Sequence, residues 1–217
     1  MIEFTLWDIL RNLLLAARWT IALSLIAFLG GALVGMPVTM ARISERGLAR
    51  RLAGAYIAFF QGTPLLVQIF LAFFGLALLG FDVPPLAAAA LALMLYTSAF
   101  LAEIWRGAIE SVPKGQWEGA RSLALTRFQQ MRFIILPQAL RVGIGPTAGF
   151  SVQVIKGTAL ASIIGFVELT KAGTMIVNAT FDPFRVYGLL ALFYFALCYP
   201  LSLCAKAIER RMAVQGH

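Results

Sequence analysis

Lys156 is an ionisable residue whose position in this sequence suggests ligand binding. It interrupts an otherwise uncharged run over residues 143–167 and lies ~20 Å along it, at 1.5 Å per residue. A lysine at that depth in a membrane is costly and marks a functional-site candidate; the alternative is a structural pair with a buried carboxylate or a helix-end carbonyl. Thr158 and Ser162 share a helix face beyond it, and Glu168 follows the run. These side chains could bind an ionised ligand.

A second group of polar side chains surrounds the sequence QGTP at 61–64. Pro64 has no backbone N–H and clashes with the preceding helical turn, so a helix through this point must bend. The freed carbonyls, and the side chains of Gln61, Thr63 and Gln68, need partners that lipid does not offer. We expect a bent, polar-lined wall of a pathway; the alternative is a kinked helix whose polar groups are satisfied by neighbouring segments.

A third group contains Tyr96, Ser98, Glu103 and Arg106 at the end of another apolar run. Glu103 and Arg106 are three residues apart, so they can pair on one helix face. The pair could belong to a ligand pathway, or it could be a salt bridge at the membrane interface.

Bond-breaking and metal chemistry have few candidates. The only histidine is His217, the last residue, which excludes a His-based catalytic or metal site. Cys198 and Cys204 do not share a helix face and form no CxxC pattern, so we interpret both as packing residues. The nucleotide-binding pattern GxxxxGK[ST] does not occur. We expect a protein that is not an enzyme, without a metal site or a cofactor of its own.

The polar groups are positioned by segments long enough to cross a membrane. The chain has 217 residues, of which 60% are hydrophobic and 13% charged, against about 25% charged in an ordinary soluble domain. A spanning helix needs ~20 apolar residues. Five segments meet this length, the last of them interrupted only by Lys156: Trp19–Ala41, Leu52–Phe81, Val83–Ala102, Val186–Ala205 and Gly143–Val167. The sequence therefore predicts an all-α membrane protein with five transmembrane helices.

The formal net charge of +8 is distributed as a topology signal rather than as a nucleic-acid-binding patch. Counted along the chain, residues 42–51 carry +3, residue 82 carries −1, 103–141 carry +3, 168–185 sum to zero and 206–211 carry +2. Positive loops favour the cytoplasm, so we expect the N-terminus outside and the C-terminus inside. The basic residues could also hold anionic membrane lipid in a minor role.

The rest of the chain predicts a single transmembrane domain over residues 1–217. Residues 1–18 carry Glu3 and Asp8 before their apolar part, which argues against a signal peptide. Their helical spacing predicts an interfacial helix along the outer surface; the alternative is an early start of the first span. No internal repeat occurs, so the chain resembles one half of a pathway completed by a second copy or a related subunit.

The charged segment over residues 118–141 lies between apolar runs, on the side predicted to be cytoplasmic. Pro113 favours a helix start nearby, and small residues from Gly119 to Ala124 give that helix a close-approach face. A second helical piece should begin at Thr126 and end before Pro137. A short charged helix of this kind suits docking into a groove on another protein; the alternative is a surface helix packed on its own bundle.

At these residues the sequence resembles the permease subunits of ATP-binding-cassette importers of the type I fold. Their cytoplasmic signature is matched by Glu118-Gly119-Ala120, then Ala124, then Ile134-Ile135-Leu136-Pro137. The polar amino acid branch is similar over further segments that together cover nearly the whole chain: QGTPLLVQIF (61–70), AFLAEIWRGAIESVPKGQWEGARSL (99–123), ILPQALR (135–141) and VIKGTALASIIGFVELT (154–170).

Three positions depart from that pattern. Gly119 replaces the commoner alanine at a helix-propensity cost of up to ~1 kcal/mol. Ala124 stands where glycine is usual, so a tight turn with positive φ there becomes doubtful. Gly157 replaces an aspartate that many relatives have after the lysine, which weakens any argument from that position for a cationic cargo.

The resemblance implies a transport subunit in a bacterial cytoplasmic (inner) membrane. Two permease subunits, identical or paralogous, would form the pathway, and an extracytoplasmic amino-acid-binding protein would deliver the cargo. A cytoplasmic ATPase subunit would bind ATP and Mg²⁺ and receive the coupling loop, residues 112–137. The implied ATPase-coupling residues are Glu118, Gly119, Ala120, Ala124, Leu125 and Pro137.

An amino acid cargo presents a carboxylate, which needs donors, and an ammonium, which needs a carboxylate or carbonyls. We take Glu103, Thr158, Ser162 and Glu168 as the leading pathway residues, with Thr63, Gln68, Tyr96, Ser98, Arg106 and Lys156 beside them. Two alternatives stay open: a scaffold permease whose related partner binds the cargo, and a secondary transporter without an ATPase.

Overall fold

The computed structural model of this chain describes residues 5–214, which are almost entirely helical. Three of the helical segments are not α-helix: the wide π-type turns η1 (Leu71–Gly75) and η2 (Gln130–Ile135), and the 3₁₀ segment η3 (Thr158–Ile164). The α-helices of the described residues are α1 (Leu6–Arg42), α2 (Gly47–Gly62), α3 (Leu65–Phe70), α4 (Leu76–Leu78), α5 (Pro85–Glu110), α6 (Lys114–Ser122), α7 (Arg127–Gln129), α8 (Leu136–Gly157), α9 (Leu169–Thr180) and α10 (Pro183–Val214).

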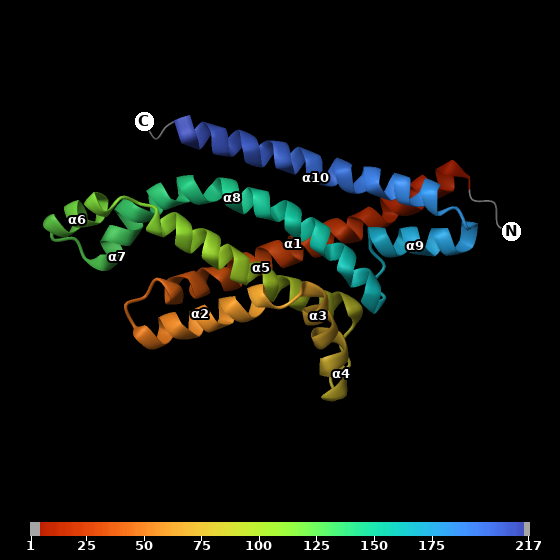
Figure 1. The fold of residues 1–217 in the computed structure, drawn as a ribbon, viewed down its shortest axis with the longest axis horizontal. Helices are drawn as coiled ribbons and strands as arrows, with labels where there is room; N and C mark the ends of the chain where they lie inside the picture. Colours follow the sequence, from red (N-terminus) through yellow and green to blue (C-terminus); the bar gives the residue numbers. More distant parts are fainter. Residues whose placement is uncertain (1–4, 215–217) are drawn as a thin grey trace.

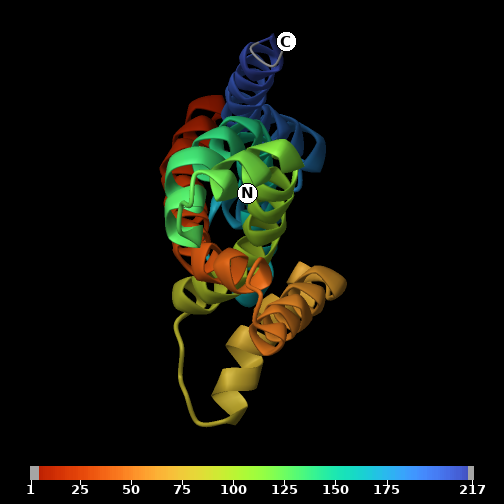
Figure 2. The same cartoon turned by 90° about the vertical axis from the view of Figure 1, so that its left-hand side faces the viewer.

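Four helical segments are long and apolar enough to cross a membrane, and a fifth span results if one bent pair counts as a single crossing. The four are Leu6–Arg42, Pro85–Glu110, Arg127–Ile164 and Pro183–Arg210, and they follow the long axis of the molecule (Figure 1). The pair is α2 with α3–α4, bent by 101°. The predicted all-helical membrane fold is confirmed. The second span is broken rather than gently kinked, and α3 to α4 projects from the other helices (Figure 2).

Close contact between α1 and α5 organises the core of the bundle. A Cβ atom added to Gly31 would lie 2.6 Å from Cβ of Thr97, and one added to Gly35 would lie 3.0 Å from the carbonyl oxygen of Ser98. Two glycines four residues apart therefore let the two backbones approach closely. The same core contains Leu23, Ile69, Leu93, Val154 and Ile164, which join α1, α3, α5, α8 and η3.

The N-terminal segment does not form the separate interfacial helix expected over residues 1–18. Within the described residues, α1 begins at Leu6 and continues without a break to Arg42. Thr5 caps it: its hydroxyl accepts the Asp8 amide at 3.2 Å, and its own amide donates to the Asp8 carboxylate at 3.0 Å. The early start of the first span is the arrangement found. The 37 residues of α1 extend about 55 Å, well beyond a ~30 Å hydrocarbon layer.

The helix expected to end before Pro137 instead continues through it into α8. The wide turn η2 precedes the proline, and the Leu136 amide donates to the carbonyl of Met131, five residues back. This widening accommodates the missing N–H and the bulk of the proline ring, which would disrupt regular α-helix.

Helix α9 was not foreseen from the sequence. It lies beside the N-terminal half of α1, at the end of the molecule opposite α6 (Figure 1). Its twelve residues are too few to span a membrane. Its N-cap is Glu168 rather than serine, threonine, aspartate or asparagine, so the usual sequence signal of a helix start is missing.

Candidate functional site

Helix α6 lies with α7 at one end of the long bundle (Figure 1), and it connects the candidate spans Pro85–Glu110 and Arg127–Ile164. Pro113 occupies the position before its first turn, as the sequence predicts. Glu118 and Gly119 are exposed, whereas Ala120 is buried. An added Cβ at Gly119 would meet nothing within 4 Å, so glycine is not required there by packing. The helix presents an exposed, charged face beyond the spans.

The turn after α6 is built although Ala124 replaces the glycine that usually makes it. Ala124 adopts a left-handed conformation with φ of 55°. Its amide donates to the carbonyl of Arg121 at 2.9 Å, and the Leu125 amide donates to the carbonyl of Ala120 at 3.4 Å. The side-chain amide of Gln130 then donates to the Leu125 carbonyl at 2.7 Å. Neighbouring hydrogen bonds therefore hold a residue with a Cβ where glycine is preferred.

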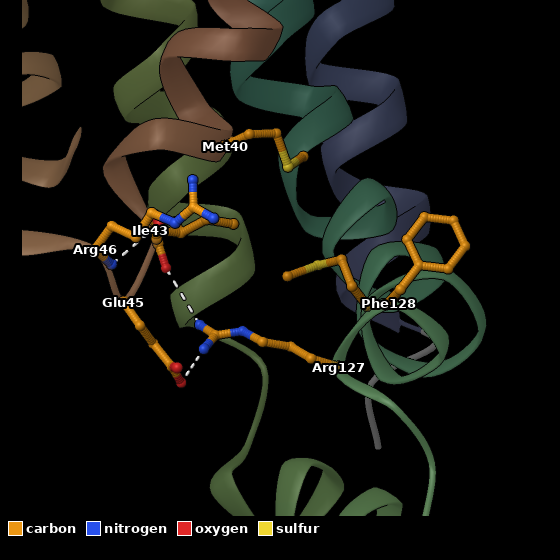
Figure 3. A pocket seen from close by; sticks show the side chains of 8 residues that line it. Met40, Ile43, Glu45, Arg46, Arg127 and Phe128 are labelled. Carbon is orange, nitrogen blue, oxygen red and sulfur yellow. Dashed lines mark hydrogen bonds and ion pairs between the residues drawn. The ribbon is translucent and has the colours of Figure 1, made fainter.

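The chain after this turn is attached to the turn between α1 and α2. Thr126 caps α7 and exchanges hydrogen bonds with Gln129. Arg127 forms an ion pair with Glu45, and its guanidinium donates to the carbonyl of Ile43 at 3.4 Å (Figure 3). Pro137, predicted to belong to the coupling residues, is exposed in the first turn of α8.

Glu103 and Arg106 pair on one face of α5, as their spacing predicts, with 2.7 Å between an arginine nitrogen and a carboxylate oxygen. Arg106 also pairs with Glu110, and Arg42 of α1 approaches Glu103 at 3.7 Å. This network lies at the end of α5 that leads into α6. Arg106 is bonded to both glutamates, whereas Nε of Arg42 is buried without a hydrogen-bond partner in the described residues. The arrangement is that of a salt bridge on α5 with Arg42 of α1 beside it.

Gln68 and Thr63 lie together at the break between α2 and α3. The buried side-chain amide nitrogen of Gln68 donates to the carbonyl of Phe60 at 2.9 Å, to the carbonyl of Thr63 at 3.1 Å and to the Thr63 hydroxyl at 2.8 Å. The break is thus satisfied within the chain. The carbonyl oxygen of the Gln68 side chain is buried without a hydrogen-bond partner in the described residues.

Tyr96 and Ser98 occupy two different environments on α5. The Ser98 hydroxyl is buried, 2.6 Å from the Tyr56 hydroxyl of α2, and donates to the carbonyl of Leu95. The half-buried Tyr96 ring packs against the Phe100 ring at 4.6 Å, and Phe100 stacks on Phe150 at 5.2 Å. Ser98 fastens α2 to α5, whereas Tyr96 belongs to an aromatic contact between α5 and α8.

Lys156 is exposed near the end of α8, and no salt bridge joins it to a carboxylate of the described residues. Gln153, one turn earlier on the same helix face, is exposed as well, and the sequence-based selection missed it. Its polarity within an apolar span was the available signal. A lysine and a glutamine at this depth must face protein or water rather than lipid. Thr158 is buried and donates to the Ile155 carbonyl at 2.7 Å; Ser162 is half-buried.

Gly157 shows why the residue after Lys156 is small here. An added Cβ would lie 3.2 Å from a Leu65 methyl group and 3.3 Å from a Leu93 methyl group. The position therefore faces α3 and α5, and a carboxylate there would displace apolar packing.

Glu168 is fully buried where α1, α9 and α10 meet. One carboxylate oxygen accepts the Lys171 amide at 2.9 Å and so caps α9. The other accepts hydroxyl hydrogen bonds from Tyr194 at 3.0 Å and Thr20 at 3.4 Å. Burial raises the pKa of this carboxyl group above its ordinary value, and the hydrogen bonds oppose that shift in part.

The predicted site residues therefore fall into separate groups rather than one pocket. Thr63 lies with Gln68, Glu103 with Arg106, and Lys156 with Gln153, while Glu168 is bonded elsewhere. In residues 5–214 no three His, Cys, Asp or Glu side chains gather as a metal site.

A multi-pass helical membrane protein with a short charged helix outside its spans is the class that this geometry defines. The sequence matches the family described as binding-protein-dependent transport system inner membrane component over residues 31–214. The chain belongs to this family, and its identification as an ATP-binding-cassette importer permease is confirmed.

Relatives match along the whole chain. The chain is 35% identical to the probable amino-acid ABC transporter permease protein YckA of Bacillus subtilis (strain 168), over 98% of this chain and 99% of that protein. It is 32% identical to the glutamine transport system permease protein GlnP of Escherichia coli (strain K12), over 96% of each.

Solved structures share the fold. A chain from the crystal structure of an amino acid ABC transporter with histidines superposes with a TM-score of 0.89 at 31% identity, covering 97% of this chain and 100% of that one. A chain of the MetNI methionine ABC transporter in an inward-facing conformation superposes with a TM-score of 0.79 at 21% identity, over 98% and 99% of the two chains. The latter likeness concerns the fold alone.

Proposed function

We propose that this chain is the membrane-spanning subunit of an ATP-driven amino acid importer. Its relatives YckA and GlnP are named for amino acid and glutamine transport, and the structure with the TM-score of 0.89 is an amino acid transporter. The chain would lie in a bacterial inner membrane with its N-terminus outside. It would form the pathway with a second permease subunit and receive cargo from an extracytoplasmic binding protein.

Coupling to ATP hydrolysis is assigned to the segment from α6 to the Ala124 turn. The observation that carries this assignment is the exposure of Glu118 and Gly119 on a short helix beyond the spans, connected to a span at each end. A cytoplasmic ATPase subunit, which would hold ATP and Mg²⁺, would receive this helix in a groove. Movement of the ATPase would then reach α5 on one side and α8 on the other.

The cargo pathway is assigned to the face of α8 that exposes Gln153 and Lys156, because these polar groups have no partner among the described residues that explains their depth. Lys156 would meet the cargo carboxylate. Further polar groups would contribute to the cargo pathway if the helices separate during transport: Thr158, Ser162, Tyr96 and the break at Thr63. The remaining predicted residues would chiefly hold together the helices that form the pathway: Glu103, Arg106, Ser98, Gln68 and Glu168.

The test of coupling is charge reversal at Glu118, matched by charge reversal at Asp82. Asp82 is also exposed, but it precedes α5 at the end opposite α6. The tagged chain is purified from its native membrane in mild detergent, and co-purifying proteins are identified by mass spectrometry. Glu118→Lys should lose an ATPase subunit and ATP-dependent uptake while remaining membrane-inserted, and Asp82→Lys should keep both. Normal uptake by Glu118→Lys would refute the coupling assignment.

A further inference from the structure

A cavity of about 400 Å³ opens between the turn joining α1 to α2 and the start of the α7–η2 segment (Figure 3). Arg46 and Arg127 supply cationic groups to its lining. Met40 and Phe128 supply apolar surface, and both are exposed, at 42% and 73%. The cavity is therefore amphipathic, with guanidinium groups beside apolar side chains that are open to the surroundings.

This cavity lies where the apolar parts of two spans give way to charged sequence. The uncharged run of α1 ends at Ala41, next to Met40, and Arg42 follows. On the other wall, Arg127 and Arg132 precede the apolar run Phe133–Leu136. Such a transition marks the boundary between the hydrocarbon layer and the headgroups. An occupant of the cavity would have its polar part beside the arginines and its apolar part along the helices.

The guanidinium groups of Arg46 and Arg127 differ in whether they already have hydrogen-bond or ion-pair partners. Arg127 is bonded to the Glu45 carboxylate and to the Ile43 carbonyl. The Arg46 guanidinium has no ion-pair or hydrogen-bond partner in the part of the chain that the structure describes. Its backbone is bonded: the amide donates to the Ser44 hydroxyl at 3.2 Å, and the carbonyl accepts the Arg50 amide at 3.1 Å. Arg46 therefore has its full set of donors free, and Arg127 could exchange a mobile carboxylate for another oxyanion.

The surroundings strengthen the positive field. A neighbouring cavity of about 190 Å³ shares Ile43, Ser44, Arg127 and Met131 with the first and adds two arginines and one carboxylate to its lining: Arg42, Arg50 and Glu110. Basic pockets between spanning helices on the cytoplasmic side are typical sites for the headgroups of anionic lipids. Guanidinium groups suit a phosphate because their planar donors match two of its oxygens.

We propose that this cavity binds the phosphate diester of an anionic glycerophospholipid between Arg46 and Arg127, with acyl chains along Met40 and Phe128. Glu45 competes with the phosphate for Arg127. Arg127 follows the Ala124 turn by three residues. When the site is occupied, the direct ion pair between Arg127 and Glu45 is replaced by an interaction in which the lipid phosphate connects α7 to the α1–α2 turn. This site is independent of the cargo and of the ATPase assignment.

The test measures lipid retention by the full chain, purified with any subunits that accompany it in mild detergent. Equimolar phosphatidylglycerol and phosphatidylcholine are added, and bound lipids are counted by native mass spectrometry. The wild type should retain phosphatidylglycerol preferentially. Arg46→Gln with Arg127→Gln should weaken its retention about 25-fold, at about fivefold for each arginine. Glu45→Gln should strengthen retention, because it removes the competing carboxylate.

The matched control removes two arginines elsewhere: Arg11→Gln with Arg185→Gln. Both are exposed and lie near the starts of α1 and α10, and these helix ends are opposite α6 (Figure 1). This control pair should still retain phosphatidylglycerol in preference to phosphatidylcholine. Arg46→Lys with Arg127→Lys should do so as well, because it keeps both positive charges, and it controls for folding. Equal losses in the two glutamine pairs, or no change in Glu45→Gln, would overturn the site. Displacement of the lipid by inorganic phosphate at equal concentration would show a small-anion site instead and would equally overturn the proposal.

Discussion

The side-chain amide nitrogen of Gln68 lies 2.9 Å from the carbonyl oxygen of Phe60, across the break between α2 and α3. Phe60 is the residue whose carbonyl Pro64 cannot bond, because a proline four residues later has no N–H. The glutamine therefore supplies from its side chain the donor that the backbone lacks. A break of 101° within an apolar segment depends on this substitution of one donor for another.

Gln68→Leu should consequently destabilise the folded chain by about 1–3 kcal/mol, since the carbonyls of Phe60 and Thr63 lose a buried donor. Thermal unfolding in detergent measures the effect. Gln61→Leu is the matched control, because Gln61 is exposed and makes only a 3.3 Å bond to the Ala99 carbonyl. Equal melting temperatures for the two variants would mean that Gln68 does not support the break.

Replacing Ala124 with glycine should stabilise the turn after α6 by about 1 kcal/mol, because its φ of 55° strains any residue with a Cβ. The same change at Ala120, buried within α6, should instead destabilise by a similar amount through lost helix propensity and packing. The melting temperatures of the two variants should therefore move in opposite directions. A fall for Ala124→Gly would show that the alanine contributes contacts that outweigh its strain.

Glu168 should make stability depend on pH. The pKa of its carboxyl group is raised by burial, so the folded chain retains a proton that the unfolded chain has already released. The free energy of unfolding is then highest below the ordinary carboxyl pKa and declines as pH rises through the window up to the raised value. Melting temperatures measured at increasing pH, starting below the ordinary glutamate pKa of about 4.3, should show this decline.

Glu168→Gln should flatten that part of the profile, because the amide does not titrate, while its carbonyl oxygen can still cap α9. Asp82→Asn changes an exposed carboxylate that no salt bridge joins to another group of the described residues, and it serves as the control, which should keep the slope. An unchanged slope in Glu168→Gln would assign the pH dependence to another group.

Lys156→Gln should reduce ATP-dependent uptake of the transported amino acid about tenfold or more, the loss expected for one charge-assisted bond to a carboxylate. Uptake of a panel of radiolabelled amino acids by cells expressing the whole transporter measures it. Lys156→Arg should retain uptake, and Lys206→Gln, which removes an exposed lysine of α10, should have little effect. Unchanged uptake and selectivity in Lys156→Gln would place the cargo site in the second permease subunit.

The features that the sequence predicted well are those that depend on composition and on near neighbours. Apolar runs located the spans, Pro113 located the start of α6, and spacing predicted the Glu103–Arg106 pair. The close approach at Gly31 and Gly35 also follows from local pattern, since small residues four apart lie on one helix face.

The features that sequence reasoning missed depend on contacts between distant segments. Glu168 is a helix cap held by Thr20 and Tyr194, and neither residue is near it in the sequence. Helix α9 packs against α1, so its tertiary contacts, rather than its short amphipathic pattern, stabilise it. The turn at Ala124 forms for a local reason instead: the Gln130 side chain, only five residues beyond Leu125, donates to the Leu125 carbonyl and supports the left-handed residue before it.

The run from Arg127 to Ile164 is helical throughout its 38 residues, and its variations in turn width do not interrupt it. At 1.5 Å per residue it is a lever arm of about 57 Å, and a tilt of about 10° at one end would carry the other end about 10 Å sideways. Arg127 and Lys156 are on the same arm. Lys156 lies about 44 Å along this arm from Arg127, so the same tilt beside the Ala124 turn would displace it by about 8 Å, which is comparable to the distance between packed helices.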